Sequence, residues 1–315
     1  MQALIDTIGR LPLPGDAQRV FHGRGGLHPG GEDWALDWYA PVWVATHFGQ
    51  ASDAEVHALG TALAARWAEI GQGRPLNWVL QRRQPDGPVS RPITELMSGD
   101  VPEPHVVEED GARYLVQVMK GQNRGLFLDM AEGRRWVRAN AQGARVLNLF
   151  AYTCAFSVAA LHGGAAQVVN LDMAGGAIAT GQRNHRINFA GTPQEARAKF
   201  LVHDLFHSWG KLTRLGPYDL VVLDPPSYQK GSFVAQKDYP RLLRRLPGLL
   251  APGGRALICL NAPEIPEAVL REQLAREAPA MVVEQRLPNP AAFADTSPER
   301  ALKVLVARLE HPAQS

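Results

Sequence analysis

The sequence predicts an α/β protein whose larger domain is built on a mostly parallel sheet, with a smaller α+β domain before it. From about residue 125 onwards, short apolar runs alternate with helix-forming segments at the spacing of β–α–β units. The apolar run 146–149 leads through a short loop into a helix of small residues, and the next apolar run ends in Asp172. A strand, loop and helix followed by an acid at the end of the next strand is typical of sheets that bind a nucleoside.

The bulk properties set limits on the class of protein. A chain of 315 residues with 45% hydrophobic residues can form two domains with a sizeable core. No apolar run is long enough to cross a bilayer, and no basic segment followed by an apolar one predicts a secretory signal. The two cysteines, Cys154 and Cys259, lie far apart, which predicts reduced thiols and a cytoplasmic protein. A net charge of +2 is compatible with an RNA partner but does not by itself indicate one.

The first third of the chain predicts an irregular arm and the small domain. Residues 1–32 are rich in Gly and Pro and show little periodicity, so we expect an irregular arm there. Residues 33–120 are expected to form the small α+β domain, whose tryptophans recur at core spacing; a role in holding RNA is the alternative. Its expected elements are strands within 34–48, a helix from the capping box at 52–55 to residue 71, a strand over 76–81, a Pro-rich loop over 84–104 and a hairpin that turns at 110–111.

Residues 121–315 are expected to form the larger domain. The expected strands cover 145–149, 168–172, 199–203, 219–224, 255–261, 281–287 and 302–309. The expected helices cover 131–140, 154–162, 175–188, 236–250 and 265–277. Arg241, Arg244 and Arg245 form a basic spot on one of these helices, which on its own is more typical of a solvated helix face.

The loop that follows the first strand of this domain, Asn148 to Cys154, contains no glycine. Glycines let a loop backbone approach a pyrophosphate closely, so a dinucleotide would fit poorly here. A nucleoside with an amino-acid tail, such as S-adenosylmethionine (SAM), needs less close approach, and its carboxylate suits the N-terminus of the following helix. The alternative is an ordinary strand-to-helix turn.

Acids follow the next two strands. Asp172 closes the second strand, where its carboxylate would accept hydrogen bonds from ribose hydroxyls, and Met173 would pack on adenine. Asp204, followed by Leu205, stands after the third strand at a position suited to an adenine contact. A helix cap is the alternative role for Asp172.

The segment from Asp224 through Pro225 and Pro226 closes a later strand and indicates methyl transfer rather than redox chemistry. The prolines fix φ and remove N–H donors, which makes the loop stiff and points its carbonyls outward. The Asp224 carboxylate and an outward carbonyl can accept hydrogen bonds from the edge of a nucleobase, and Tyr228 or Phe233 could stack on it. A purely structural Pro-Pro turn is the alternative.

These motifs resemble those of the SAM-dependent methyltransferases of bacterial large-subunit (23S) ribosomal RNA, which include 5-methylcytosine and N7-methylguanine enzymes. The chain is more similar to the N7-methylguanine branch. The resemblance covers roughly 110–265 and is carried by 125–129, 146–153, Asp172, Asp204, 224–227 and 236–239. It implies a Rossmann-like class I methyltransferase fold, with a seven-stranded mixed sheet whose last inserted strand is antiparallel. It also implies SAM contacts from Phe127, Asp129, Asn148, Phe150, Ala151, Tyr152, Thr153, Asp172, Asp204 and Asp224.

Three departures from the family pattern bear on the chemistry. Cys154 stands where the family has a glycine, and Met130 and Ala131 stand where it often has a His-Arg or Gln-Arg pair. Asn261 occupies the position of the nucleophilic cysteine of the cytosine-C5 enzymes, which need a thiolate to activate the base. Cys259, two residues earlier, is expected to be a buried core thiol. The pattern therefore favours methylation of a nitrogen.

The sequence predicts a SAM-dependent methyltransferase that acts on a guanine nitrogen in ribosomal RNA, with Asp224 and the Pro225 carbonyl orienting a flipped-out base. We expect no metal, because the His203 and His207 pair has no third ligand, and no membrane partner. Two alternatives stay open: a methyltransferase for a protein side chain or small molecule, and a non-catalytic RNA-binding assembly factor. The oligomeric state is not predicted.

Overall fold

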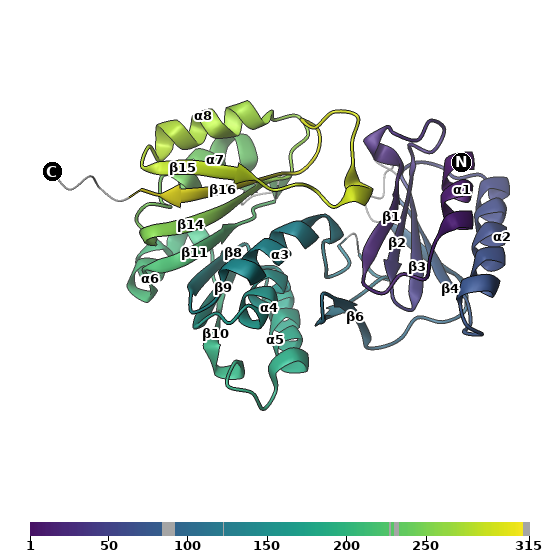
Figure 1. The fold of residues 1–315 in the computed structure, drawn as a ribbon, viewed down its shortest axis with the longest axis horizontal. Coiled ribbons are helices and arrows are strands. Elements are labelled where there is room, and N and C mark those ends of the chain that lie inside the picture. Colours follow the sequence, from purple (N-terminus) through teal and green to yellow (C-terminus); the bar gives the residue numbers. More distant parts are fainter. Residues whose placement is uncertain (84–91, 122, 227, 230–232, 311–315) are drawn as a thin grey trace. The chain divides into compact units, whose positions relative to one another are not determined.

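The computed structural model describes residues 1–83, 92–121, 123–226, 228–229 and 233–310, and for 228–229 and 233–236 it describes the backbone alone. The chain divides into two compact units (Figure 1). The first contains Met1–Asp129 with Pro290–Pro298, and the second contains Met130–Asn289 with Glu299–Ser315. No helix among the described residues is long and apolar enough to cross a membrane.

The first unit contains a five-stranded sheet in the order β1-β2-β3-β4-β5, in which β3 and β4 are parallel and the other neighbours antiparallel. Its strands are β1 (Gln18–His22), β2 (Trp34–Tyr39), β3 (Val42–His47), β4 (Asn77–Arg82) and β5 (Ile93–Ser98). Helix α2 (Asp53–Ile70) connects the two parallel strands and begins at the expected capping box, where the Ser52 side chain accepts a hydrogen bond from Glu55 N–H. All five tryptophans of 33–120 are at most 5% exposed, so the expected packing role is confirmed.

Residues 1–32 do not form the irregular arm that their Gly and Pro content predicts. They contain helix α1 (Gln2–Arg10), strand β1 and the 3-10 helix η1 (Gly23–Gly25). Leu4 and Ile8, one helical turn apart, are fully buried in the tryptophan-rich core, and that burial stabilises a helix whose sequence pattern is too short to stand out. The Pro-rich loop expected over 84–104 is also wrong in part, since β5 pairs with β4.

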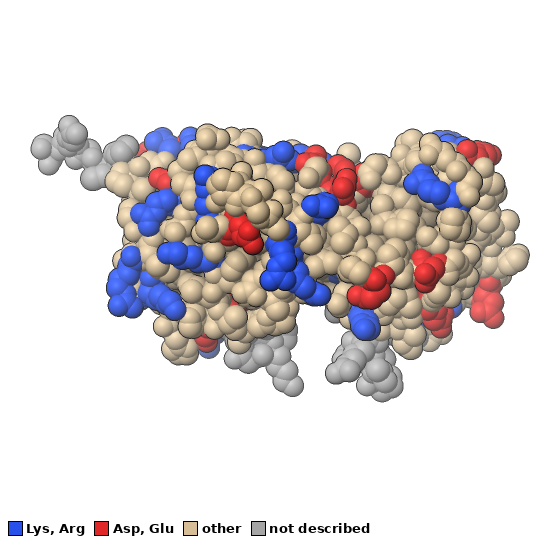
Figure 2. Space-filling model, turned by 90° about the horizontal axis from the view of Figure 1, so that it is seen from below, with Lys and Arg blue, Asp and Glu red and all other residues tan. Residues whose placement is uncertain are grey.

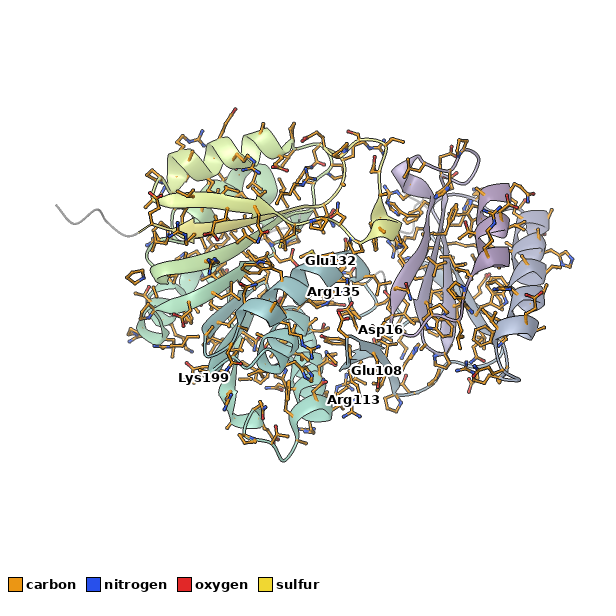
Figure 3. The ribbon with its side chains drawn as sticks, viewed as in Figure 1. Asp16, Glu108, Arg113, Glu132, Arg135 and Lys199 are labelled. Atoms are coloured by element: carbon orange, nitrogen blue, oxygen red, sulfur yellow. The ribbon has the colours of Figure 1, made fainter. Side chains whose placement is uncertain are left out.

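The expected hairpin is confirmed as β6 (His105–Glu109) and β7 (Ala112–Val116). Asp110 and Gly111 at its turn both have left-handed φ values, 49° and 76°, as the tightest hairpin turns require. Hydrogen bonds tie it to the segment before β1: Ala17 N–H donates to the Glu108 carbonyl, and Asp110 N–H donates to the Asp16 carboxylate (Figure 3). The first unit also includes 290–298 with η5 (Ala291–Phe293), where Thr296 N–H donates to the Gly25 carbonyl.

The second unit is built on the seven-stranded sheet that the resemblance implies. Its order is β10-β9-β8-β11-β14-β16-β15, and β16 is antiparallel to both neighbours. The strands are β8 (Arg145–Leu149), β9 (Gln167–Asp172), β10 (Ala198–Val202), β11 (Tyr218–Leu223), β14 (Leu250–Leu260), β15 (Met281–Arg286) and β16 (Lys303–Leu309). A short hairpin of β12 (Tyr228–Gln229) and β13 (Phe233–Val234) follows β11.

Helices cover both faces of this sheet (Figure 1). They are α3 (Ala131–Asn140), α4 (Ala155–His162), α5 (Gly175–Phe189), α6 (Trp209–Leu215), α7 (Ala235–Leu243) and α8 (Glu267–Glu277), with the 3-10 helices η2 (Leu128–Met130), η3 (Glu195–Arg197) and η4 (Leu205–His207). Helix α7 ends earlier than the expected residue 250, because β14 already begins there. Helix α6 was not expected.

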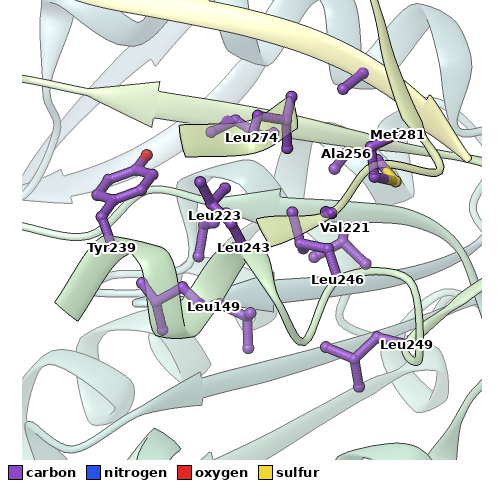
Figure 4. Close-up of a cluster of buried hydrophobic side chains, with 14 of the residues drawn as sticks. Leu149, Val221, Leu223, Tyr239, Leu243, Leu246, Leu249, Ala256, Leu274 and Met281 are labelled. Atoms are coloured by element: carbon purple, nitrogen blue, oxygen red, sulfur yellow. The ribbon is translucent and has the colours of Figure 1, made fainter. Parts of the chain in front are cut away.

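The main core lies on one face of the sheet. Leu149 and Leu223 from neighbouring strands pack with Leu212 of α6, Leu243 of α7 and Leu274 of α8 (Figure 4). Alternate strand residues point to the opposite face, where α4 and α5 contact β8, β9 and β10. The two helix layers hold the strand ends rigidly, which positions the loops at the carboxyl edge.

Candidate active site

Five adjacent parallel strands, β10, β9, β8, β11 and β14, bring their carboxyl ends to one edge of the sheet. Strand β8 pairs with β9 on one side and with β11 on the other, so the strand order reverses next to β8. Leu149 of β8 pairs with Leu171 and with Leu223, which places the residues after them side by side. Such a reversal point is where open α/β sheets bind ligands. The structure therefore brings the loop after β8, Asp172 and Asp224 together.

The loop after β8 has a constrained backbone. Phe150, Tyr152 and Cys154 all have left-handed φ values, 56°, 47° and 61°. This conformation costs a non-glycine residue about 1–2 kcal/mol. Hydrogen bonds hold the loop in place: Ala151 N–H donates to the Leu171 carbonyl at 3.0 Å, and Tyr152 N–H donates to an Asp172 carboxylate oxygen at 2.8 Å. The loop is thus fixed against the next strand.

Cys154 has a specific place in this loop. Its left-handed backbone explains why a glycine suits this position in the family that the sequence resembles. The Cys154 side chain is fully buried, and burial raises the pKa of its thiol well above the usual value. Its Sγ fills the space beside Gly181 of α5, where an added Cβ would lie only 2.4 Å from the sulfur. The cysteine therefore fits only because α5 has a glycine opposite it.

The Asp172 carboxylate is oriented by two backbone donors. One oxygen accepts from Tyr152 N–H and the other from Ala174 N–H, each at 2.8 Å. A carboxylate has about four acceptor positions, so acceptor capacity remains for a ligand. Met173, expected to pack on adenine, is 48% exposed beside it. Asp172 thus stabilises the turn before α5, but the N-cap of that helix is Ala174, so the alternative of a helix cap is wrong. The geometry of Asp172 leaves ligand binding open.

Asp204 and Leu205 have different surroundings. Asp204 begins η4, accepting a hydrogen bond from Phe206 N–H at 2.7 Å, and its other oxygen lies 3.2 Å from His207 Nδ1. Its side chain is 42% exposed. Leu205 is buried in the main core, so its side chain does not reach the surface. His207 thus contacts the Asp204 carboxylate. No group of three metal-binding side chains occurs among the residues described.

Several expected cofactor residues point inward. Asn148 is buried and donates to the side chain of Asn170, which in turn donates to Ser157 Oγ. Ser157 Oγ lies 2.8 Å from His185 Nε2, and burial lowers the pKa of His185 to about 4. The side chain of Thr153 is also buried, as is Ala151, and Phe150 packs against the main core. Their contacts with a ligand would therefore come chiefly from the backbone.

The loop after β11 presents Asp224 at the sheet edge. Asp224 and Pro226 are half-buried and Pro225 is buried. Ser227 lies outside the described residues, as do the side chains of Tyr228 and Phe233, so their stacking role stays a prediction.

A buried tyrosine of the 236–239 motif connects α7 to β14. Tyr239 of α7 donates from its hydroxyl to the carbonyl of Cys259, and burial raises the pKa of Tyr239, with a smaller contribution from the charge of Asp224. Cys259 is fully buried, as expected for a core thiol. The only signal for Tyr239 in the sequence was its place in the 236–239 motif.

Phe127 and Asp129 belong to the first unit. Phe127 is 41% exposed, and Asp129 lies close enough to Arg19 to act on its pKa. Their contacts with SAM stay predictions.

Comparison with known proteins decides the family. A family profile described as S-adenosylmethionine-dependent methyltransferase matches residues 18–308. The chain belongs to this family. The methyltransferase resembles the ribosomal RNA large subunit methyltransferase of Deinococcus radiodurans, with 31% identity over 81% of this chain and 63% of the relative. It resembles ribosomal RNA large subunit methyltransferase I of Aeromonas salmonicida, with 32% identity over 59% of this chain and 47% of the relative. It thus spans less than two thirds of each relative's length.

Solved structures show the same fold. SMU.776, a methyltransferase solved with SAH, superposes with a TM-score of 0.79 and 22% identity over 98% of this chain and 81% of that one. The tRNA m1G37 methyltransferase of M. jannaschii superposes with a TM-score of 0.60 and 13% identity over 88% of this chain and 72% of that one. The methyltransferase has the class I fold with a mixed sheet of seven strands and an additional N-terminal sheet unit.

Proposed function

We propose that this methyltransferase transfers the methyl group of SAM to a guanine nitrogen of large-subunit ribosomal RNA. The observation that carries the proposal is the meeting of the constrained 150–154 loop, Asp172 and Asp224 at the point where the strand order reverses. The ribosomal substrate is supported by the names of the relatives, which are ribosomal RNA large subunit methyltransferases.

The residues at the sheet edge fit SAM, which supplies a methyl group bonded to a positively charged sulfur. The half-buried Asp172 carboxylate, fixed by two N–H donors, would accept hydrogen bonds from ribose hydroxyls. The exposed Met173 would cover one side of adenine, and Asp204 would accept from its amino group. Loop amides and the N-terminus of α4 would face the amino-acid carboxylate.

The role of Asp224 follows from its place beside this loop. Its carboxylate and the Pro225 carbonyl would accept hydrogen bonds from the edge of a base drawn out of the RNA stack. They would hold a ring or amino nitrogen so that its lone pair points at the methyl carbon, and the new N–C bond forms as the S–C bond breaks. The fully buried Cys259 is not placed to attack a base, which supports nitrogen over the C5 atom of cytosine.

A methyl-transfer assay tests the proposal. The protein is incubated with tritiated SAM and deproteinised ribosomal RNA from cells that lack the corresponding gene, and the RNA is then digested to nucleosides for mass spectrometry. We expect label in a methylated guanosine of the large-subunit RNA. Label in methylcytidine would refute the nitrogen assignment, label only in protein or small molecules would support the alternative substrate class, and no transfer despite SAM binding would indicate a non-catalytic factor.

A further inference from the structure

The second unit carries a surface of arginines and aromatic rings between η4, α6 and α7. Arg241 of α7 lies over the ring of Phe206, with its guanidinium carbon 4.2 Å from the ring centroid. One turn later, Arg245 lies over the ring of Trp209 at 5.7 Å. Phe206 and Trp209 contact each other edge to face, with their centroids 6.3 Å apart. These four side chains, with Lys211 and Arg214 of α6, are called the arginine–aromatic surface below.

Charge pairing leaves this surface positive. Arg241 is paired with Asp238 at 2.9 Å, and the nearby Arg244 is paired with Glu277, so these two are neutralised locally. Lys211, Arg214 and Arg245 have no carboxylate partner among the residues that the structure describes; Lys211 contacts His203, and Arg214 contacts the carbonyl of Gly210. Figure 2 shows Lys and Arg gathering over the left part of the face it presents, with few acids among them.

Each of the two aromatic rings lies beneath a guanidinium group. Phe206 and Trp209 are half-buried and pack against the main core, so they do not move freely. A guanidinium that lies over a ring on one side can stack on a nucleobase with its other side. Arg241 and Arg245 themselves are exposed. An acidic protein segment would need positive charge alone, whereas two guanidinium groups that lie over aromatic rings, next to cations without a carboxylate partner among the described residues, suit a chain of bases and phosphates.

The position of the surface connects it to the candidate active site. Phe206 comes two residues after Asp204, and α7 follows the Asp224 loop through the β12–β13 hairpin. The surface thus begins beside the carboxyl edge, and Lys211 contacts His203 just after β10. It extends along α6 toward the amino edge, where the Leu215 carbonyl accepts a hydrogen bond from Arg145 at the start of β8. One end of a bound strand would therefore lie next to the edge where its target base must enter.

We propose that the arginine–aromatic surface binds the single-stranded RNA that flanks the target nucleotide, with bases stacked on Arg241 and Arg245 and phosphates paired with Lys211 and Arg214. The inference rests on the proposed function, since it assigns the RNA a place on the methyltransferase unit. It predicts that binding is strongly salt-dependent, because phosphate contacts release counterions.

A double charge reversal tests the surface in the full chain. The variant Lys211→Glu with Arg245→Glu is compared with Arg183→Glu and Arg186→Glu, two exposed arginines on α5, which covers the opposite face of the sheet. The probe is a fluorescein-labelled oligouridine, titrated at several salt concentrations. We expect the first pair to weaken binding by roughly tenfold or more and to lower the slope of log affinity against log salt by about 0.7, because Lys211 is the one residue of this pair that is assigned a phosphate. The α5 pair should leave both unchanged.

Two further measurements separate the outcomes. Binding of S-adenosylhomocysteine, followed by calorimetry, should be equal in both variants, which shows that the fold and cofactor site are intact. If both double variants lose the same RNA affinity, or if neither loses any, the arginine–aromatic surface is not the RNA-binding surface. The proposed function would still stand in that case. Competition by polyglutamate as strong as that by oligouridine would also overturn it, in favour of an acidic protein partner. If the unmodified protein binds no RNA, the proposed function itself fails.

Discussion

The contact between Cys154 and Gly181 predicts strong coupling between these two positions. Gly181→Ala places a methyl group 2.4 Å from Cys154 Sγ and 3.0 Å from its Cβ, in a fully buried site where neither helix can easily yield. Overpacking of this kind costs about 1–3 kcal/mol. Cys154→Gly removes both contacts, and glycine suits the left-handed backbone at φ 61°. The remaining close neighbour of the Cβ added at position 181 is then the Thr153 carbonyl carbon at 3.3 Å.

In the Cys154→Gly background, Gly181→Ala should therefore be neutral or stabilising. Alanine is favoured over glycine in a helix interior by about 1 kcal/mol, which is no longer opposed by the clash. We expect an interaction free energy of about 1–3 kcal/mol between the two substitutions, measured as a double-mutant cycle in urea denaturation. Cys154 is the last residue of the loop, directly before α4. Gly181→Ala alone should therefore also weaken S-adenosylhomocysteine binding, and the double variant should regain the lost affinity. Free energies that add within about 0.5 kcal/mol would refute the reasoning.

Three other predictions address the site and its supports. Asp224→Ala should abolish methyl transfer yet leave the fold intact by circular dichroism; full activity would disprove its role in orienting the base. Cys259→Ser should leave methyl transfer intact, and a covalent RNA adduct that is trapped by the unmodified protein and lost in the variant would contradict nitrogen attack. The buried His185 has a pKa of about 4, below its usual 6.5, so its neutral form is stabilised by folding. Its contribution is fully present above pH 6.5 and is lost as the pH falls toward 4, by about 1.4 kcal/mol per unit. His185→Gln should flatten the dependence of unfolding free energy on pH in this range; an unchanged profile would show that His185 does not titrate as described.

Much of the larger domain could be predicted because its signals are local. Apolar runs that end in Asp172 or Asp224, separated by helical segments, define parallel strands whose carboxyl ends share an edge, and the structure has these strands within a few residues of the expected bounds. The small domain was harder. Helix α1 and strand β5 have short patterns next to prolines and depend on burial of Leu4 and Ile8 or on pairing with β4. Residues 290–298 belong to the first unit although they lie far along the chain, and no local sequence pattern predicts this.

The site shows the same division. Residue type and spacing alone determined that acids and a proline-stiffened loop stand at strand ends. The length of a strand follows from its apolar run, and its direction follows from the helical segments that connect it to the neighbouring strands. Tertiary structure decided which side chains face a ligand: Asn148 turns into a buried network, Cys154 depends on Gly181, and Tyr239 reaches Cys259. It also brought Arg241 and Arg245 onto the rings of Phe206 and Trp209 in the neighbouring elements η4 and α6. Those contacts join residues far apart in sequence, and only packing of the whole sheet and its helices determines them.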